Sequence, residues 1–191
     1  PLYSSAASDV YKRQGYNFTG TVIDAAAYGH PSGYALATTD GVWVWGGIES
    51  WGRHFTFPGV STKSFTKLNL PSDLDPSAIK SISVSSGGFM FLMNDGSVYV
   101  FAGSLNGGLP ANRFNINGSG LTAASTNFTK VKLNATTDLT NIDQVIATHN
   151  AGFAVSFSQN KFYTWGTNVY LGNGTATVSY THLRAHETEA D

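Results

Sequence analysis

Three segments of the 191-residue chain share one design, in which aromatic and aliphatic residues alternate around a central turn and a glycine follows. They read GYALATTDGVWVWGG at 33–47, GFMFLMNDGSVYVFAG at 88–103 and GFAVSFSQNKFYTWGT at 152–167. Alternation with a period of two predicts paired strands. Asp40-Gly41 and Asp95-Gly96 predict type I′ turns with positive φ at both central residues, and Gln159-Asn160 replaces them in the third copy.

A second landmark repeats independently of the hairpins. FTKLNLPSDLDPSAIKSISV begins at Phe65, and FTKVKLNATTDLTNIDQVIA begins at Phe128, 63 residues later. The closing aromatic residues of the hairpins, Trp45, Phe101 and Trp165, lie 56 and 64 residues apart. Each unit therefore contains an alternating FTK strand, a polar loop, a short second strand and a hairpin. Four-stranded units of this length cannot bury both faces alone, so we expect consecutive sheets to stack face to face.

The motifs resemble repeats of the regulator of chromosome condensation (RCC1) family, which are seven-bladed β-propellers. In that family a small residue or histidine precedes an apolar strand, Asp-Gly and an aromatic strand ending in Trp-Gly follow, and Leu-Gly-x-Gly comes next. The segments AYGHPSGYALATTDGVWVWGG (27–47) and ATHNAGFAVSFSQNKFYTWGTNVYLGNGT (147–175) carry this pattern. The middle copy departs from it, with Ser85-Ser86 in place of the histidine and Phe101-Ala102-Gly103 in place of Trp-Gly.

The resemblance implies an all-β fold, a partial β-propeller of about three four-stranded blades. Its repeats span about 15–64, 65–127 and 128–177. For some members of the family it also implies guanine-nucleotide exchange on a small GTPase. The loops that would supply exchange residues diverge here, so no such residue is carried over.

The two ends differ in character from the middle of the chain. PLYSSAASDVYKRQ (1–14) and VSYTHLRAHETEAD (178–191) resemble translated sequencing-adapter segments that flank some open reading frames in metagenomic assemblies. We therefore expect both to be non-native and 15–177 to be the native piece. Closed propellers usually have at least four blades, so we expect the natural protein to contain further blades.

Charge and composition exclude several classes of partner. Residues 15–177 contain eight Lys or Arg and eight Asp or Glu, without the basic stripe that a nucleic-acid partner requires. No apolar run is long enough to cross a bilayer, so membrane insertion is not expected. The chain has no cysteine, which excludes disulfides and thiol catalysis. Low Lys with abundant Asn, Thr and Gly leans toward an exported or cell-surface microbial protein.

Residues with catalytic potential are better explained by structure. His30 and His149 recur at corresponding places, which favours backbone hydrogen bonding over catalysis. Asp73 and Asp75 are expected in a solvated turn rather than a calcium site, because the spaced oxygen ligands are missing. His182 and His186 lie in the suspected adapter tail. The repeated aromatic residues are expected in the inter-blade core rather than in a stacking platform: Trp43, Trp45, Tyr99, Phe101, Tyr163 and Trp165.

The remaining candidates lie in two loops that leave the same point of successive repeats, at 46–62 and 102–127. Aromatic and arginine side chains are enriched at interface hot spots, and the loops hold Trp51, Arg53, His54, Phe55, Arg113 and Phe114. The alternative is that these side chains fold back onto the blades. We predict a non-enzymatic scaffold that binds a protein partner through these loops, with no catalytic residue, metal or cofactor. The alternatives are a nucleotide-exchange factor and a propeller domain of a secreted polysaccharide-active enzyme.

Overall fold

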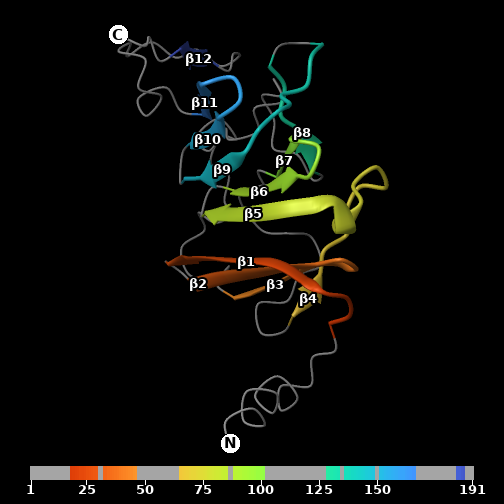
Figure 1. The fold of residues 1–191 in the computed structure, drawn as a ribbon. Coiled ribbons are helices and arrows are strands. Elements are labelled where there is room, and N and C mark those ends of the chain that lie inside the picture. The colour runs from red at the N-terminus through yellow and green to blue at the C-terminus, as the bar shows by residue number, and fades with distance from the viewer. Residues whose placement is uncertain are drawn as a thin grey trace, which may run out of the picture.

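The computed structural model describes residues 18–29, 32–46, 65–85, 88–101, 128–133, 136–148, 151–166 and 184–187. Within these ranges the chain forms three four-stranded antiparallel sheets. The sheets follow one another along the chain and stack in the same order, as Figure 1 shows. The predicted all-β architecture of three four-stranded blades is confirmed.

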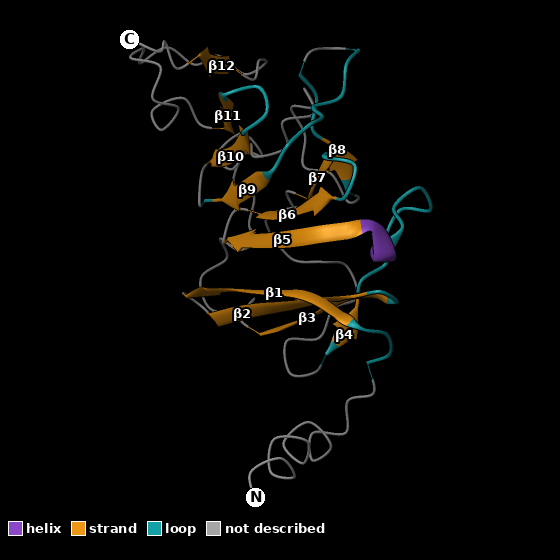
Figure 2. Cartoon of the chain, viewed as in Figure 1, coloured by secondary structure: helices purple, strands orange, loops and turns teal. Residues whose placement is uncertain are grey.

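The first sheet contains β1 (Val22–Gly29), β2 (Ser32–Thr38), β3 (Gly41–Gly46) and β4 (Thr66–Lys67), paired in that order. The second contains β5 (Ile79–Ser85), β6 (Gly88–Met93), β7 (Val98–Phe101) and β8 (Thr129–Lys130). The third contains β9 (Gln144–Ala147), β10 (Ala151–Ser156), β11 (Lys161–Gly166) and β12 (Arg184–Glu187). A single turn of 3₁₀ helix, η1 (Pro76–Ala78), precedes β5 and is the helical segment in Figure 2.

The sheets are offset by one strand from the sequence repeats. The FTK segment at Phe65, expected to open the second unit, instead supplies β4 and pairs with β3 through Trp43↔Lys67. The FTK segment at Phe128 likewise supplies β8 and pairs with β7 through Tyr99↔Lys130. The first and second blades therefore begin at the strand before the hairpin and end at the next FTK segment, whereas β12 is the fourth strand of the third blade.

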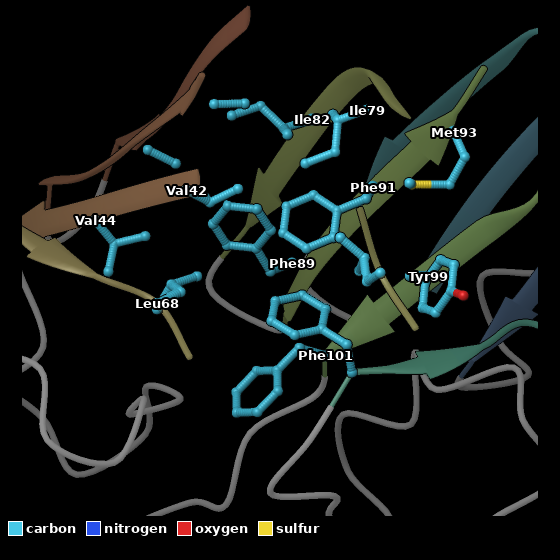
Figure 3. Close-up of a cluster of buried hydrophobic side chains, with 14 residues drawn as sticks. Val42, Val44, Leu68, Ile79, Ile82, Phe89, Phe91, Met93, Tyr99 and Phe101 are labelled. Atoms are coloured by element: carbon cyan, nitrogen blue, oxygen red, sulfur yellow. The ribbon is translucent and has the colours of Figure 1, made fainter. Parts of the chain in front are cut away.

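Each sheet has a leading face, toward the preceding sheet in the chain, and a trailing face, toward the following one. Between the first and second sheets, small and β-branched side chains of the first trailing face (Ala35, Ala37, Val42, Val44) meet Phe89, Phe91, Tyr99 and Phe101 of the second leading face. Figure 3 shows Val42 and Val44 opposite Phe89 and Phe91. This is the larger of the two cores.

The second interface buries the trailing face of the second sheet against the leading face of the third. Met90, Leu92, Val98 and Val100 pack with Ala154, Tyr163 and Trp165. All seven side chains are buried. Because β6 and β7 are buried on both faces, they read as nearly continuous apolar runs, as expected for a blade with a neighbour on each side.

Hydrogen bonds between the first strands of successive blades join the stack. The Ile82 amide donates to the Asp24 carboxylate at 2.8 Å, from β5 to β1. The Ala147 amide of β9 donates to the Ser83 hydroxyl of β5 at 2.8 Å, and the Ser85 hydroxyl of β5 donates at 2.7 Å to the carbonyl of Thr148, the residue after β9. These polar contacts fix the lateral position of each blade on the next.

The hairpin turns differ from the predicted type I′. Neither Asp40 nor Asp95 has a positive φ. In the first sheet Thr38 pairs with Gly41, so the connecting residues are Thr39 and Asp40. In the second, Gly96 alone takes the left-handed conformation, with φ of 78°.

The third turn keeps that left-handed position without a glycine. Asn160 has φ of 51°, and the tolerance of asparagine for this region was expected. In both turns the left-handed residue donates its amide back three residues, Gly96 to Met93 and Asn160 to Phe157.

The third sheet also departs from the repeat in register. In the aligned repeats Phe153 corresponds to Phe89, and Ala147 corresponds to Val84. In the second sheet Val84 pairs with Phe89, but in the third sheet Ala147 pairs with Gly152, one residue before Phe153. The slip of one residue turns Phe153 to the trailing face, because side chains alternate along a strand. Gly152 then lies opposite Trp165, and a Cβ on Gly152 would come within 2.3 Å of the Trp165 ring.

Candidate functional site

The two candidate loops attach at equivalent places of successive blades. In the first blade β3 ends at Gly46, and the next described residue is Phe65, directly before β4. In the second blade β7 ends at Phe101, and the next described residue is Phe128, directly before β8. Both connections therefore run from the third strand to the fourth strand of a blade, at the same end of the sheet.

The predicted binding residues themselves lie outside the described part of the chain. Trp51, Arg53, His54 and Phe55 fall within 47–64, and Arg113 and Phe114 fall within 102–127. His30 and His149 are outside it as well, as is His182. The expectations for all of these residues stay predictions, and the described residues define the base on which the two loops stand.

Stacked aromatic rings form that base. Phe65, the first described residue after the first loop, stacks on Trp45 with ring centroids 3.8 Å apart. Trp45 in turn stacks on Tyr34 at 5.1 Å. In the second blade Phe128 packs against Phe101 at 5.2 Å, and its ring stacks on Phe91 at 4.5 Å. The phenylalanine of each FTK segment thus anchors the returning end of its loop.

The lysine of each FTK segment lies over an aromatic ring of the neighbouring strand. Lys67 Nζ is 5.6 Å from the centroid of Trp43, and Lys130 Nζ is 5.4 Å from the centroid of Tyr99. Both pairs are cross-strand neighbours in the sheet register. Repetition of Phe-Thr-Lys in the sequence therefore reflects a repeated contact, with one ring stacked and one cation placed over a ring.

Lys130, on the outer strand β8 of the second blade, belongs to a network of polar side chains. The Tyr99 hydroxyl donates to the Asp73 carboxylate at 3.2 Å. Asp138 accepts a hydrogen bond from Lys132 at 2.9 Å and lies 3.9 Å from Lys130. Burial raises the pKa of Tyr99 above its usual 10.0, and attraction to the Tyr99 oxygen is the largest cause that raises the pKa of Lys130. Both pKa shifts are upward, so both groups keep their protons at neutral pH.

The other sequence candidates have structural surroundings in the described chain. Tyr99, Phe101, Tyr163 and Trp165 are buried between blades, as predicted. Trp43 and Trp45 lie half-buried on the leading face of the first sheet. Asp75 caps η1 by accepting hydrogen bonds from the Ser77 amide and hydroxyl. Among the residues that the structure describes, no group of three His, Cys, Asp or Glu side chains could hold a metal ion.

One contact that sequence reasoning missed has a signal in the sequence. Asp24 and Asp143 both follow an isoleucine at the start of a blade's first strand, in VIDAAA and NIDQVI. Asp24 accepts the Ile82 amide of the next blade, and Asp143 accepts the Phe157 amide of its own hairpin turn. The repeated Ile-Asp pair could have pointed to a shared position.

No family model matches the chain, and no curated protein matches it. Solved structures do match. Human WBSCR16 aligns with a TM-score of 0.60 at 13% identity, over 88% of this chain and 42% of that one. Prp20p from Saccharomyces cerevisiae, studied for its binding to Gsp1p and histones, aligns with a TM-score of 0.56 at 16% identity, over 82% of this chain and 35% of that one.

A second structure of the yeast protein, RCC1 (Prp20) bound to Kap60, aligns with a TM-score of 0.54 at 16% identity. It covers 82% of this chain and 34% of that one. The chain thus spans about a third to two fifths of the length of these proteins. No helix in the described ranges is long and apolar enough to cross a membrane. The three stacked sheets have the fold of part of an RCC1-like β-propeller.

Proposed function

We propose that the chain is a non-enzymatic propeller scaffold that binds a protein partner through the loops 46–62 and 102–127. The observation that carries the proposal is the equivalence of the two loop bases, Trp45 with Phe65 and Phe101 with Phe128. Because the blades stack, the two loop bases lie at the same end of adjacent blades, and we expect both loops to be presented to the same side. A partner can then contact both loops at once.

The similar structures support a protein partner. Prp20p is described with binding to Gsp1p and histones, and yeast RCC1 (Prp20) was solved bound to Kap60. At 16% identity the likeness concerns the fold alone. The identity of the partner of this chain is therefore left to experiment.

Affinity capture with chemical cross-linking tests the proposal. We expect a partner recovered by the intact chain to be lost when Trp51→Ala and Arg53→Ala are combined, and again when Arg113→Ala and Phe114→Ala are combined. Loss of both pairs should reduce recovery at least tenfold, since side chains of these types dominate interface energies.

Asn94→Ala is the matched control, because Asn94 is an exposed residue of the second hairpin turn, away from the loop bases. It should leave recovery unchanged. Equal recovery by the intact chain and by both double variants would remove the loops as the binding site.

Guanine-nucleotide exchange is the second candidate, and the fold shared with yeast RCC1 favours it. Release of a fluorescent guanine nucleotide from a panel of purified small GTPases separates it from simple scaffolding. Faster release that is lost in the Trp51→Ala/Arg53→Ala variant would support exchange. Binding without faster release would support the scaffold alone.

A further inference from the structure

The hairpin of the third sheet pairs its two strands one residue out of step with the hairpin of the second sheet. In the second sheet Phe89 lies opposite Phe101. In the third sheet Trp165 lies opposite Gly152, the residue before Phe153, although Phe153 is the residue that corresponds to Phe89 in the repeat. We propose that this hairpin can pair in two registers and that trailing side chains of the second sheet select the observed one.

The register decides which side chains of β10 face the second sheet. In the observed register the leading face of β10 carries only small residues, Gly152, Ala154 and Ser156. A shift of one residue would bring Phe153 opposite Trp165 and Val155 opposite Tyr163. Because Tyr163 and Trp165 lie on the leading face, the shift would turn Phe153 and Val155 toward the second sheet.

Two large side chains of the second sheet already fill that space. Met90 and Leu92, on the trailing face of β6, are completely buried in the core between the second and third sheets. The backbone of Gly152 is so close to the Trp165 ring that a Cβ at this position would collide with it. A phenylalanine turned into this core would overfill it, because protein interiors are close-packed and respond to added volume with strain.

The interface between the first and second sheets shows the opposite arrangement. The first sheet has Ala35 and Ala37 at the positions that Met90 and Leu92 occupy in the second. These alanines face the phenylalanine rings of β6, which take the register that the third hairpin lacks. Small trailing side chains thus meet large leading ones at the first interface, and large trailing side chains meet small leading ones at the second.

The third hairpin turn is compatible with both registers. Asn160 is left-handed and donates its amide to the Phe157 carbonyl at 3.2 Å, as in the equivalent turn of the second sheet. There Met93, the counterpart of Phe157, donates its amide to the Ser97 carbonyl. The Phe157 amide donates instead to the Asp143 carboxylate at 2.7 Å. A shift of one residue would restore the ladder bond that Met93 makes without a change of turn.

The choice of register also changes the outer surface of the third blade. In the observed register Phe153 and Val155 lie on its trailing face. In the shifted register Ala154 and Ser156 would replace them there. The core of the second blade therefore determines whether a neighbour on that face meets large or small side chains.

Cysteine cross-linking tests the proposal, because the chain has no cysteine of its own. Thr164 lies opposite Phe153 in the observed register and would lie opposite Ala154 in the shifted one. The observed-register pair is Phe153→Cys/Thr164→Cys, and the shifted-register pair is Ala154→Cys/Thr164→Cys. Mass spectrometry after equilibration in a glutathione redox buffer gives the cross-linked fraction of each. We expect the observed-register pair to cross-link at least about tenfold more strongly, since the other two side chains point to opposite faces.

Substitution of the two large side chains should reverse this preference. Met90→Ala/Leu92→Ala gives the second sheet the small residues of the first, and we expect the shifted-register pair to cross-link at least about tenfold more strongly in this background. Val42→Ala/Val44→Ala is the control, because it removes apolar volume from the first interface only. The control should keep the preference for the observed-register pair.

Circular dichroism establishes that each variant is folded. If the double alanine variant unfolds, Met90→Val/Leu92→Val removes less volume and should move the preference in the same direction by a smaller factor. A folded variant of either kind that keeps the wild-type preference would overturn the proposal. So would an equal change in the control, since that would mean general loosening. The measurement needs no partner protein, so its outcome is independent of the proposed loop function.

Discussion

The ammonium group of Lys67 lies 5.6 Å from the centre of the Trp43 ring, across the last two strands of the first blade. Lys130 repeats the arrangement over Tyr99 in the second blade, at 5.4 Å. The fourth strand of each of these two blades has only two residues, so few backbone hydrogen bonds hold it. Side-chain contacts from the FTK segment therefore contribute much of its attachment.

A double-mutant cycle on Lys67 and Trp43 measures this attachment. Lys67→Met keeps the alkyl chain and removes the charge, and Trp43→Leu removes the aromatic face. We expect a coupling free energy of about 0.5–1 kcal/mol, the size of a cation–π contact at an exposed site. Urea denaturation of the four proteins gives the value. Additive losses would mean that the lysine acts through packing of its stem alone.

The phenylalanines of the two FTK segments should differ in their contribution to stability. Phe128 is buried and touches Phe89, Phe91 and Phe101 in the core between blades. Phe65 is half-buried on Trp45, at the end of the stack. We expect Phe128→Ala to lower the free energy of unfolding by about 3–5 kcal/mol, the usual cost of truncating a core phenylalanine. Phe65→Ala, measured in the same urea series, should cost clearly less, and equal losses would contradict the assignment of Phe128 to the core.

The backbone conformation at position 96, in the second hairpin turn, requires a glycine. Its φ is 78°, and a Cβ would lie 2.9 Å from the backbone nitrogens of Asn141 and Ile142. The Ile142 amide also donates to the Gly96 carbonyl, which joins the second hairpin to the third blade. A residue with a Cβ pays about 1–2 kcal/mol to adopt the left-handed conformation. We expect Gly96→Ala to lower the free energy of unfolding by more than this, because the Cβ would also be too close to Asn141 and Ile142. Asn94→Ala in the same turn is the control, and thermal unfolding distinguishes the two.

Asp95 gives the same turn a dependence on pH. Its carboxylate accepts a hydrogen bond from the Ser97 amide at 2.8 Å, and hydrogen bonding to Ser97 is the main cause that lowers the pKa of Asp95 below 3.8. A lowered pKa in the folded state means that the contribution is complete above about pH 4 and is lost as pH falls through the folded value. The melting temperature of the wild type should exceed that of Asp95→Asn at pH 6. The difference should shrink toward pH 2, and a constant difference would exclude a role for ionisation.

How far the sequence predicts the fold depends on which contacts set each feature. Period-two alternation and the repeated aromatic residues predicted the hairpins and the stacking of sheets, because both follow from local sequence and burial. The sheet that each FTK strand joins was not predictable in this way. Thr66 pairs with Val44 of the preceding hairpin, and a long connection separates the two residues in the sequence. The register of the third sheet depends on Trp165 seating over Gly152, a tertiary contact that alignment of repeats hides.

The sequence predicted where the candidate site lies in the fold, but not how its side chains are arranged. The equivalence of the two loops followed from the repeat, and the described loop bases agree with it. Loop side chains have no periodicity that fixes their direction, so Trp51 and Arg113 are candidates by residue type alone.

The expected foreign character of 178–191 can be tested through β12. This strand pairs with β11, from Lys161↔Glu187 to Thr164↔Arg184. Its sequence, Arg-Ala-His-Glu, has neither the phenylalanine nor the lysine of the FTK segments, and its single apolar side chain is the small Ala185. We expect deletion of 178–191 to change the free energy of unfolding by less than about 1 kcal/mol, as for surface changes.

Trp165→Ala in the full chain is the reference for damage to the third blade. Trp165 is buried in the core between the second and third sheets, and its loss should cost about 3–5 kcal/mol. If the deletion approaches that loss, β12 is a structural strand and the chain depends on it. If the deletion is nearly neutral while Trp165→Ala is severe, the third blade is held by its leading face on Met90, Leu92 and Val100, and the segment after residue 177 adds little to the fold.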